Sequence, residues 1–253
     1  MHLNGRQRYS FGLFATLLAL GAFSATFAGC RKDNYAVART SPIVTLPTDS
    51  VSKLAISYLA LGDSYTIGQS VSELERYPNQ IAGVLKNKGI DIQKPTIIAT
   101  TGWTTQDLLD AINTQKPAKD FTIVTLLIGV NNQYRTHDTA GYRAQFELCL
   151  QKAVEQAAGL RSHVFVISIP DYGVTPFGQA GNAALISEQI DQYNAINKSV
   201  TDNYGISYTN ITPASRLALT DPTLTCSDSL HPSGKEYAIW VEMIAPKIYE
   251  LLK

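Results

Sequence analysis

Residues 53–65 read KLAISYLALGDSY, an apolar run that ends abruptly in a glycine, an aspartate and a serine. A short, mostly apolar stretch that stops at turn-forming residues is typical of a strand buried on both faces of a sheet. Residues 121–132, FTIVTLLIGVNN, repeat this arrangement with the clearest buried strand of the chain. Strands of this kind belong to parallel sheets, so the two stretches indicate the class of fold.

Helical patterns alternate with the strands. Ile81, Val84 and Leu85 recur at helical spacing before Gly89, and similar patterns follow each later strand. The expected strands are 53–61, 96–100, 121–128, 163–169 and 206–209, and the expected helices are 77–88, 104–113, 141–160, 182–200 and 233–252. Right-handed crossovers between parallel strands place helices on both faces of the sheet. We therefore predict a three-layer α/β/α sandwich with a parallel, roughly five-stranded sheet of the flavodoxin-like kind.

The composition excludes several classes of protein. The chain has 253 residues, 45% hydrophobic and 17% charged, and its 21 basic and 21 acidic residues give a formal net charge of zero. These proportions are those of a globular protein, whereas a nucleic-acid-binding protein would carry a basic excess. Three cysteines are too few for a disulfide-rich scaffold. We expect one globular domain that acts as a monomer and has no nucleic-acid partner.

The N-terminal residues have the order of an export signal. Arg6 and Arg8 precede an uncharged apolar stretch over residues 11–28, which ends in small residues before Cys30. An uncleaved transmembrane anchor is the alternative, although the apolar stretch is short for a span and is diluted by glycine and serine.

The end of this stretch, FAGC at residues 27–30, resembles a bacterial lipobox, with Phe27 where leucine is usual. In a lipobox the cysteine is lipidated and becomes the first mature residue. We therefore predict a lipoprotein signal peptide over 1–29 and lipid attachment at Cys30. The protein would then be exported and held on a membrane of the bacterial cell envelope, in the periplasm or at the cell surface.

Residues 30–53 are polar and are interrupted by Pro42 and Pro47. This composition predicts a flexible tether, the alternative being a segment that packs along the domain surface. The globular domain is then expected over 54–253.

Three residues have the chemistry of a hydrolytic triad. Ser64 ends the first strand and turn, and His231 lies before the last helix, three residues after Asp228. Alone, a serine in such a turn is more often a helix cap, and a loop histidine more often a surface residue. Asp228 can accept a hydrogen bond from one ring nitrogen of His231, which leaves the other nitrogen to act as the base for Ser64.

Donors for a developing oxyanion are also present. Ser64, Gly102 and Asn131 all follow predicted strands, and ligands of parallel sheets bind beyond the carboxyl ends of the strands. Ser64 and Gly102 can each offer a backbone N–H, and Asn131 can offer its side-chain amide.

Four motifs in this order resemble those of the SGNH (GDSL-type) hydrolases, a branch of the ester hydrolases. They are GDSY at 62–65, with Tyr65 where leucine is frequent; TGWT at 101–104; GVNN at 129–132, with Asn132 in place of the usual aspartate; and DSLHP at 228–232. Each motif alone is weak, but four in order on an α/β pattern are specific.

The resemblance implies the role of each residue. Ser64 would be the nucleophile, His231 the base and Asp228 its partner, with the oxyanion hole formed by Ser64, Gly102 and Asn131. It also implies hydrolysis of carboxylic esters without a metal or an organic cofactor. Esters of lipids, of small acyl groups and of acetylated carbohydrates remain open as substrates. Two other functions also remain open, namely an inactive module that binds glycan or lipid and an acyltransferase.

Other hydrolase and nucleotide-binding motifs are missing from the sequence. It contains no Gly-x-Ser-x-Gly, no Gly-x-Gly-x-x-Gly, no phosphate-binding loop and no His-Glu-x-x-His. Asp63 adjoins the nucleophile, and we expect it to bond turn backbone groups rather than to act in the chemistry. Cys149 and Cys226 are expected to be two buried thiols, although a disulfide between them would brace the His231 loop.

Five aromatic residues fall in the loops after the strands, where they either pack or line a pocket for an acyl chain or a sugar face. They are Tyr65, Trp103, Tyr134, Tyr172 and Phe177. Arg135, which follows the third motif, is expected to be solvated, the alternative being contact with a polar group of the substrate.

Overall fold

The computed structural model describes residues 55–253. The predicted signal peptide over 1–29, the tether over 30–53 and the lipidation site at Cys30 lie outside these residues. None of the helices between residues 55 and 253 combines the length and the apolar character that crossing a bilayer requires.

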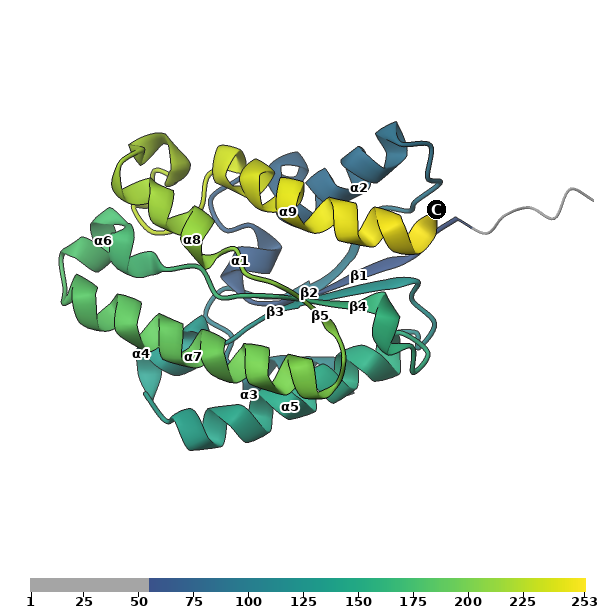
Figure 1. Ribbon diagram of the computed structural model, residues 1–253, viewed down its shortest axis with the longest axis horizontal. Coiled ribbons are helices and arrows are strands. Elements are labelled where there is room, and N and C mark those ends of the chain that lie inside the picture. The colour runs from purple at the N-terminus through teal and green to yellow at the C-terminus, as the bar shows by residue number, and fades with distance from the viewer. Residues whose placement is uncertain (1–54) are drawn as a thin grey trace, which may run out of the picture. The chain divides into compact units, whose positions relative to one another are not determined.

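Five parallel strands form one sheet at the centre of the described domain (Figure 1). They are β1 (Tyr58–Gly62), β2 (Thr96–Ala99), β3 (Ile123–Leu127), β4 (Val164–Ile167) and β5 (Ser207–Thr209). Their order is β2-β1-β3-β4-β5, and every residue of β1, β3 and β4 is buried. The parallel five-stranded sheet and its flavodoxin-like order confirm the predicted fold class.

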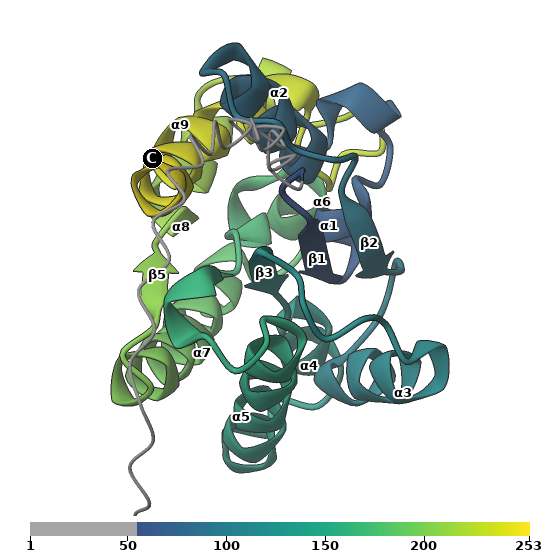
Figure 2. The same cartoon turned by 90° about the vertical axis from the view of Figure 1, so that its right-hand side faces the viewer.

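Helices cover both faces of the sheet and make the three layers seen in Figure 2. On one face, α2 (Tyr77–Asn87) packs against α9 (Gly234–Leu252). On the other face lie α3 (Thr105–Gln115), α5 (Thr139–Gln156) and α7 (Ala183–Asn203). All five predicted helices are present, with ends that differ from the expected ones by a few residues.

Side-chain caps determine where these helices begin. Thr104 Oγ1 accepts a hydrogen bond from Asp107 N at 3.3 Å, and the Asp107 carboxylate accepts one from Thr104 N at 2.8 Å. This reciprocal pair satisfies two backbone donors of the first turn of α3. Asn182 and Ser233 cap α7 and α9 in a similar way, each accepting from a backbone N–H in the first turn.

Short helical segments lie in the connections between the strands and the long helices, and the sequence pattern did not predict them. The α-helical ones are α1 (Ser64–Ile67), α4 (Val130–Arg135), α6 (Pro176–Gln179) and α8 (Thr212–Ser215). The 3₁₀ segments are η1 (Glu73–Glu75), η2 (Arg161–His163), η3 (Tyr172–Val174), η4 (Arg216–Leu219) and η5 (Pro222–Leu224). Because α1, α4, η3 and α8 come just after β1, β3, β4 and β5, they build the edge of the sheet at which ligands bind.

Candidate active site

The strand order creates a binding position between β1 and β3. After β1 the chain forms β2 on one side and then returns to the other side of β1 to form β3. Loops diverge at such a switch point and leave space beyond the carboxyl ends of the strands. A pocket of about 180 Å³ lies here, and its lining includes Ser64, Gly102, Asn131 and His231. The structure therefore brings four of the predicted site residues around one space.

The fifth residue, Asp228, lies behind His231. Its Oδ2 is 2.7 Å from His231 Nδ1, and its Oδ1 accepts backbone hydrogen bonds from His231 N at 2.9 Å and Leu230 N at 3.0 Å. Partial burial raises the pKa of Asp228, but the hydrogen bonds, the largest from Ser70, outweigh it and hold that pKa well below its usual range. An ionised Asp228 keeps the Nδ1 proton of His231 in place, so the Nε2 lone pair is free to take a proton.

The loop that carries this pair is closed on itself by backbone hydrogen bonds. Cys226 N donates to His231 O at 2.7 Å, and Ser233 N donates to Leu224 O at 2.7 Å. The ring of Tyr65 packs against the imidazole, with 5.6 Å between the ring centroids. Asp228 and His231 are thus held together as one unit, which contacts α1 through Tyr65.

Ser64 is the first residue of α1 and is almost fully buried. The preceding Asp63 is completely buried, and its Oδ1 accepts a hydrogen bond from Tyr65 N at 3.0 Å. Burial raises the pKa of Asp63 to about 7. From the other side, Tyr237 of α9 donates its hydroxyl to Tyr65 O at 2.9 Å. Asp63 thus supports the turn, as the sequence predicted, while α9 holds the segment that carries Ser64 in place.

The predicted oxyanion donors are free to bind a ligand. Among residues 55–253, neither Ser64 N nor Gly102 N donates a hydrogen bond to another residue. The Asn131 amide donates one hydrogen bond to Trp103 O at 2.9 Å, which leaves its second N–H for the pocket. These three N–H groups have no acceptor within the described domain and lie beside a buried serine. They can therefore stabilise negative charge on the oxygen of an attacked carbonyl group.

Two side chains of α4 hold the loop that carries Gly102. Asn131 bonds Trp103 O, and Arg135 Nη2 donates to Gly102 O at 2.7 Å. Arg135 is otherwise exposed, so it combines the solvated position that we expected with a contact to the loop backbone.

Two glycines are required by the local backbone. Gly102 has a φ of +86°, and Gly129, which starts the turn into α4, has a φ of +132°. A Cβ at Gly129 would lie 2.2 Å from the hydroxyl of Tyr142, too close for any side chain. Gly129 therefore lets α4 begin directly after β3, which brings Asn131 to the pocket.

Asn132 stands where the family usually has aspartate, and its contacts explain why an amide suits the site. Its Oδ1 accepts a hydrogen bond from Thr105 N at 3.0 Å, and its Nδ2 donates to Thr105 Oγ1 at 2.8 Å. The buried amide thus both accepts and donates, fastening α4 to the start of α3.

Aromatic side chains form one wall of the pocket. Tyr134, Tyr172 and Phe177 have ring centroids 6.3 Å apart in each pair. Tyr172 is buried, whereas Tyr134 is 56% exposed and Phe177 45% exposed. Tyr65 also lines the pocket, but Trp103 packs against the core instead. Four of the five loop aromatics therefore face the candidate site, and Trp103 does not.

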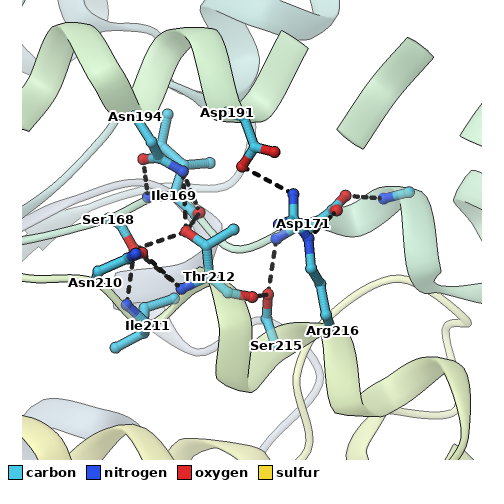
Figure 3. Close-up of polar contacts among 11 residues, drawn as sticks. Ser168, Ile169, Asp171, Asp191, Asn194, Asn210, Ile211, Thr212, Ser215 and Arg216 are labelled. Carbon is cyan, nitrogen blue, oxygen red and sulfur yellow. Dashed lines mark hydrogen bonds and ion pairs between the residues drawn. The ribbon is translucent and has the colours of Figure 1, made fainter. Parts of the chain in front are cut away.

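The buried polar network in Figure 3 holds the loop after β4. The Asn194 side chain accepts from Ile169 N at 2.8 Å and donates to Ile169 O at 2.9 Å. Further along the loop, the buried carboxylate of Asp171 accepts a hydrogen bond from Arg216 Nε at 2.9 Å. These contacts fix the backbone immediately before Tyr172 and so place one aromatic of the pocket wall.

A second carboxyl group, that of Glu236 in α9, is buried close to the site. Glu236 is only 4% exposed and faces a small cavity that Tyr65 and Asp171 also line. Burial raises the pKa of Glu236 to about 8. Glu236 is therefore mostly protonated in the folded protein at pH 7.

This burial predicts that the protein loses stability as the pH rises. Between about pH 4.5 and pH 8 the folded protein keeps a proton on Glu236 that the unfolded chain releases, so the free energy of unfolding falls with pH. Between pH 5 and pH 8 the free energy of unfolding should fall by roughly 2–4 kcal/mol less in the Glu236→Gln variant than in the wild type. Denaturant unfolding of both proteins at the two pH values measures this difference. Parallel pH profiles for the two proteins would contradict a protonated Glu236.

The two cysteines within the described residues are free. Cys149 is buried in α5, where its Sγ contacts Thr105 O at 3.4 Å, and burial raises its pKa. Cys226 is only half-buried, and burial followed by the charge of Asp228 raises its pKa to about 11. The expectation of two thiols is confirmed, but that of full burial is wrong for Cys226. Between residues 55 and 253, no group of three or more histidine, cysteine or acidic side chains is arranged to hold a metal ion.

Several residues of the site were not predicted from the sequence. Val130 and Leu230 line the pocket, and their positions beside Asn131 and His231 could have identified them. Ser70 donates its hydroxyl to Asp228 Oδ2 at 2.5 Å, a contact across 158 positions that no local pattern signals.

The fold and the four motifs are those of a class of α/β/α hydrolases, and one family model of this class matches the chain. Residues 60–239 match the model of the GDSL-like lipase/acylhydrolase family. The chain belongs to this family. A search of curated proteins finds no match.

Solved structures of the same fold include enzymes that act on esters. TesA is 15% identical with a TM-score of 0.58, over 77% of this chain and 99% of that one. The psychrotrophic esterase EstA from Pseudoalteromonas sp., solved with monoethylphosphonate as inhibitor, is 17% identical with a TM-score of 0.55, over 78% and 98% of the two chains. An acetylxylan esterase from Geobacillus stearothermophilus is 19% identical with a TM-score of 0.55, over 76% and 94%. At these identities the likeness shows the fold.

Proposed function

We propose that the protein is a carboxylic ester hydrolase that forms an acyl-enzyme on Ser64. The observation that carries the proposal is the arrangement of Ser64, Gly102, Asn131 and His231 around one pocket, with Asp228 bonded to His231. Membership of the GDSL-like lipase/acylhydrolase family supports the same class of reaction.

The reaction would begin with attack of Ser64 Oγ on the ester carbonyl. His231 Nε2 takes the hydroxyl proton, and Asp228 stabilises the resulting imidazolium through Nδ1. The carbonyl oxygen becomes negative and is held by Ser64 N, Gly102 N and the Asn131 amide. His231 then gives its proton to the departing alcohol. In the second half, water loses a proton to His231, attacks the acyl-enzyme and releases the carboxylic acid together with free Ser64.

The pocket favours a small, uncharged ester. Its volume of about 180 Å³ is below the range of about 300–1,000 Å³ that holds drug-sized ligands. The lining includes Val130, Tyr134, Phe177 and Leu230 together with the groups assigned to catalysis, and none of these four is an aspartate, glutamate, lysine, arginine or histidine. We therefore propose esters of short acyl groups as substrates. The acetylxylan esterase with the same fold makes an acetylated carbohydrate one candidate.

A panel of p-nitrophenyl esters from acetate through octanoate to palmitate tests this proposal. We expect kcat/KM to be highest for the short acyl groups, because a long chain cannot be enclosed by the pocket. A value of kcat/KM that rises steadily up to palmitate would contradict the assignment to short acyl groups.

A fluorophosphonate probe separates the enzyme from an inactive binding module. An activated Ser64 should be labelled covalently, and mass spectrometry of the peptide that contains Ser64 would show the adduct. A module that only binds ester would leave Ser64 unlabelled. Product analysis in the presence of competing alcohols distinguishes hydrolysis from acyl transfer, since a transferase would yield new esters.

We further propose that the protein is exported and anchored through a lipid on Cys30, because FAGC follows a basic and apolar leader. The full chain should then partition with membranes. The Cys30→Ser variant should lose the lipid modification, and equal lipid labelling of the two proteins would contradict the proposal.

A further inference from the structure

The turn after the nucleophile helix contacts the catalytic acid. α1 ends at Ile67 and is capped by Gly68, whose N–H donates to Ser64 O at 3.0 Å, and the chain then turns through Gln69 and Ser70. Ser70 Oγ donates to Asp228 Oδ2 at 2.5 Å, and Cys226 Sγ contacts Ser70 O at 3.5 Å. The segment that follows the nucleophile therefore touches the acid–base loop at two points.

The hydroxyl of Ser70 binds the same carboxylate oxygen that faces His231. Asp228 Oδ2 receives Ser70 Oγ at 2.5 Å and lies 2.7 Å from His231 Nδ1, while Oδ1 is taken by two backbone N–H groups. Four contacts thus fix the carboxylate in position and orientation. The two contacts on Oδ2 determine the strength and the direction of the hydrogen bond between Asp228 and the imidazole of His231.

The backbone of Ser70 indicates that the side chain matters at this position. Its φ is +68°, a conformation that glycine adopts freely and that costs free energy for most other residues. Glycine or asparagine would suit such a turn better than serine. The hydrogen bond to Asp228 is the interaction that serine adds and glycine lacks.

We propose that Ser70 is a positioning residue of the active site, which orients Asp228 through its hydroxyl and so holds His231 for proton transfer. The inference rests on the proposed hydrolytic function. It adds a fourth side chain to Ser64, His231 and Asp228, acting through Asp228 alone and without touching the substrate.

The test compares Ser70→Gly with Ser70→Ala. Both variants lose the hydroxyl, but only glycine relieves the positive φ. We expect kcat on p-nitrophenyl acetate to fall about tenfold in both, as for loss of a solvent-exposed hydrogen bond to a charged group, with KM unchanged. If Ser70 serves only the turn, Ser70→Gly should keep full kcat and unfold at an equal or higher temperature, and this result would overturn the proposal. Ala158→Gly relieves a positive φ of +54° at the end of α5, outside the residues that line the pocket, and serves as the matched control with unchanged kcat.

A double-mutant cycle with Asp228→Ala identifies the route of the effect. If Ser70 acts through Asp228, Ser70→Gly should have no further effect on kcat once the carboxylate is gone. In the Asn131→Ala background, by contrast, the tenfold loss should persist. A full tenfold loss in the Asp228→Ala background would show that Ser70 acts by another route and would contradict the proposal.

A readout without turnover separates this inference from the proposed function. The His231 Nδ1 proton bonded to Asp228 should give a downfield proton NMR resonance that is absent in Asp228→Ala. We expect it to shift in Ser70→Gly and to stay in place in Ala158→Gly. An unshifted resonance in Ser70→Gly would overturn the inference even if the enzyme hydrolyses esters. A shifted resonance in a protein without Ser64-dependent activity would instead defeat the proposed function and leave the role of Ser70 supported.

Discussion

Replacing Ser64 with alanine is expected to lower kcat on ester substrates by roughly 10⁵- to 10⁶-fold, because the variant lacks the oxygen on which the acyl-enzyme forms. The pocket wall of Tyr134, Tyr172 and Phe177 is untouched, so binding of the ester should change little. Steady-state kinetics of the purified variant, with substrate binding followed separately, measure both quantities. Within residues 55–253 the Ser64 hydroxyl makes no hydrogen bond to another side chain, so its removal from this almost buried serine should leave the fold intact, which circular dichroism can verify.

The matched control is Ser162→Ala, which removes an exposed hydroxyl at η2. This variant should retain wild-type kcat. If Ser64→Ala kept more than about 1% of the wild-type rate, Ser64 would not be the nucleophile, since such a residue loses far more when it is removed.

Changing Asp228 to asparagine is expected to lower kcat by about 10⁴-fold with little effect on the fold. The carboxylate accepts the Nδ1 proton of His231 at 2.7 Å, and an amide that turns its NH₂ group toward the ring selects the other tautomer. Nε2 would then carry the proton and could not act as the base. Because the defect is one of protonation rather than of shape, KM should stay close to the wild-type value.

Asp202→Asn is the control for loss of a carboxylate. Asp202 forms an exposed ion pair with Lys198 on α7, and such pairs contribute little to stability. Its kcat should match the wild type. An Asp228→Asn variant with equally normal kcat would show that the orientation of His231 does not depend on Asp228.

The sheet could be predicted from the sequence because a strand that is buried on both faces requires a nearly continuous run of apolar residues. Residues 123–127, which form β3, are all buried and come from a stretch that reads as apolar almost without interruption. The short helices gave no such signal. α4 has six residues, too few for a helical period to emerge, and its start depends on the φ of +132° at Gly129.

The candidate site residues could be proposed from the sequence because their chemistry is unusual at the ends of strands, whereas the residues that support them depend on tertiary contacts. Ser70 is an ordinary turn residue in the sequence, and its contact with Asp228 spans 158 positions. Glu236 stands three residues after the capping Ser233, a place where a glutamate is ordinarily solvated. Neighbouring elements bury it instead, and only the folded structure shows this.

The segment that carries Ser64 and the loop that carries Asp228 and His231 come from opposite ends of the described domain. The helix that follows this loop, α9, is joined to α1 by the hydrogen bond from the Tyr237 hydroxyl to Tyr65 O. In the proposed enzyme, a chain that grows from its N-terminus produces Ser64 early, whereas Asp228 and His231 are made only shortly before α9 (Gly234–Leu252). Partly synthesised or truncated chains that lack Asp228 and His231 should therefore not hydrolyse esters. Because of this order of residues along the chain, most of the domain is synthesised before the proposed triad is complete.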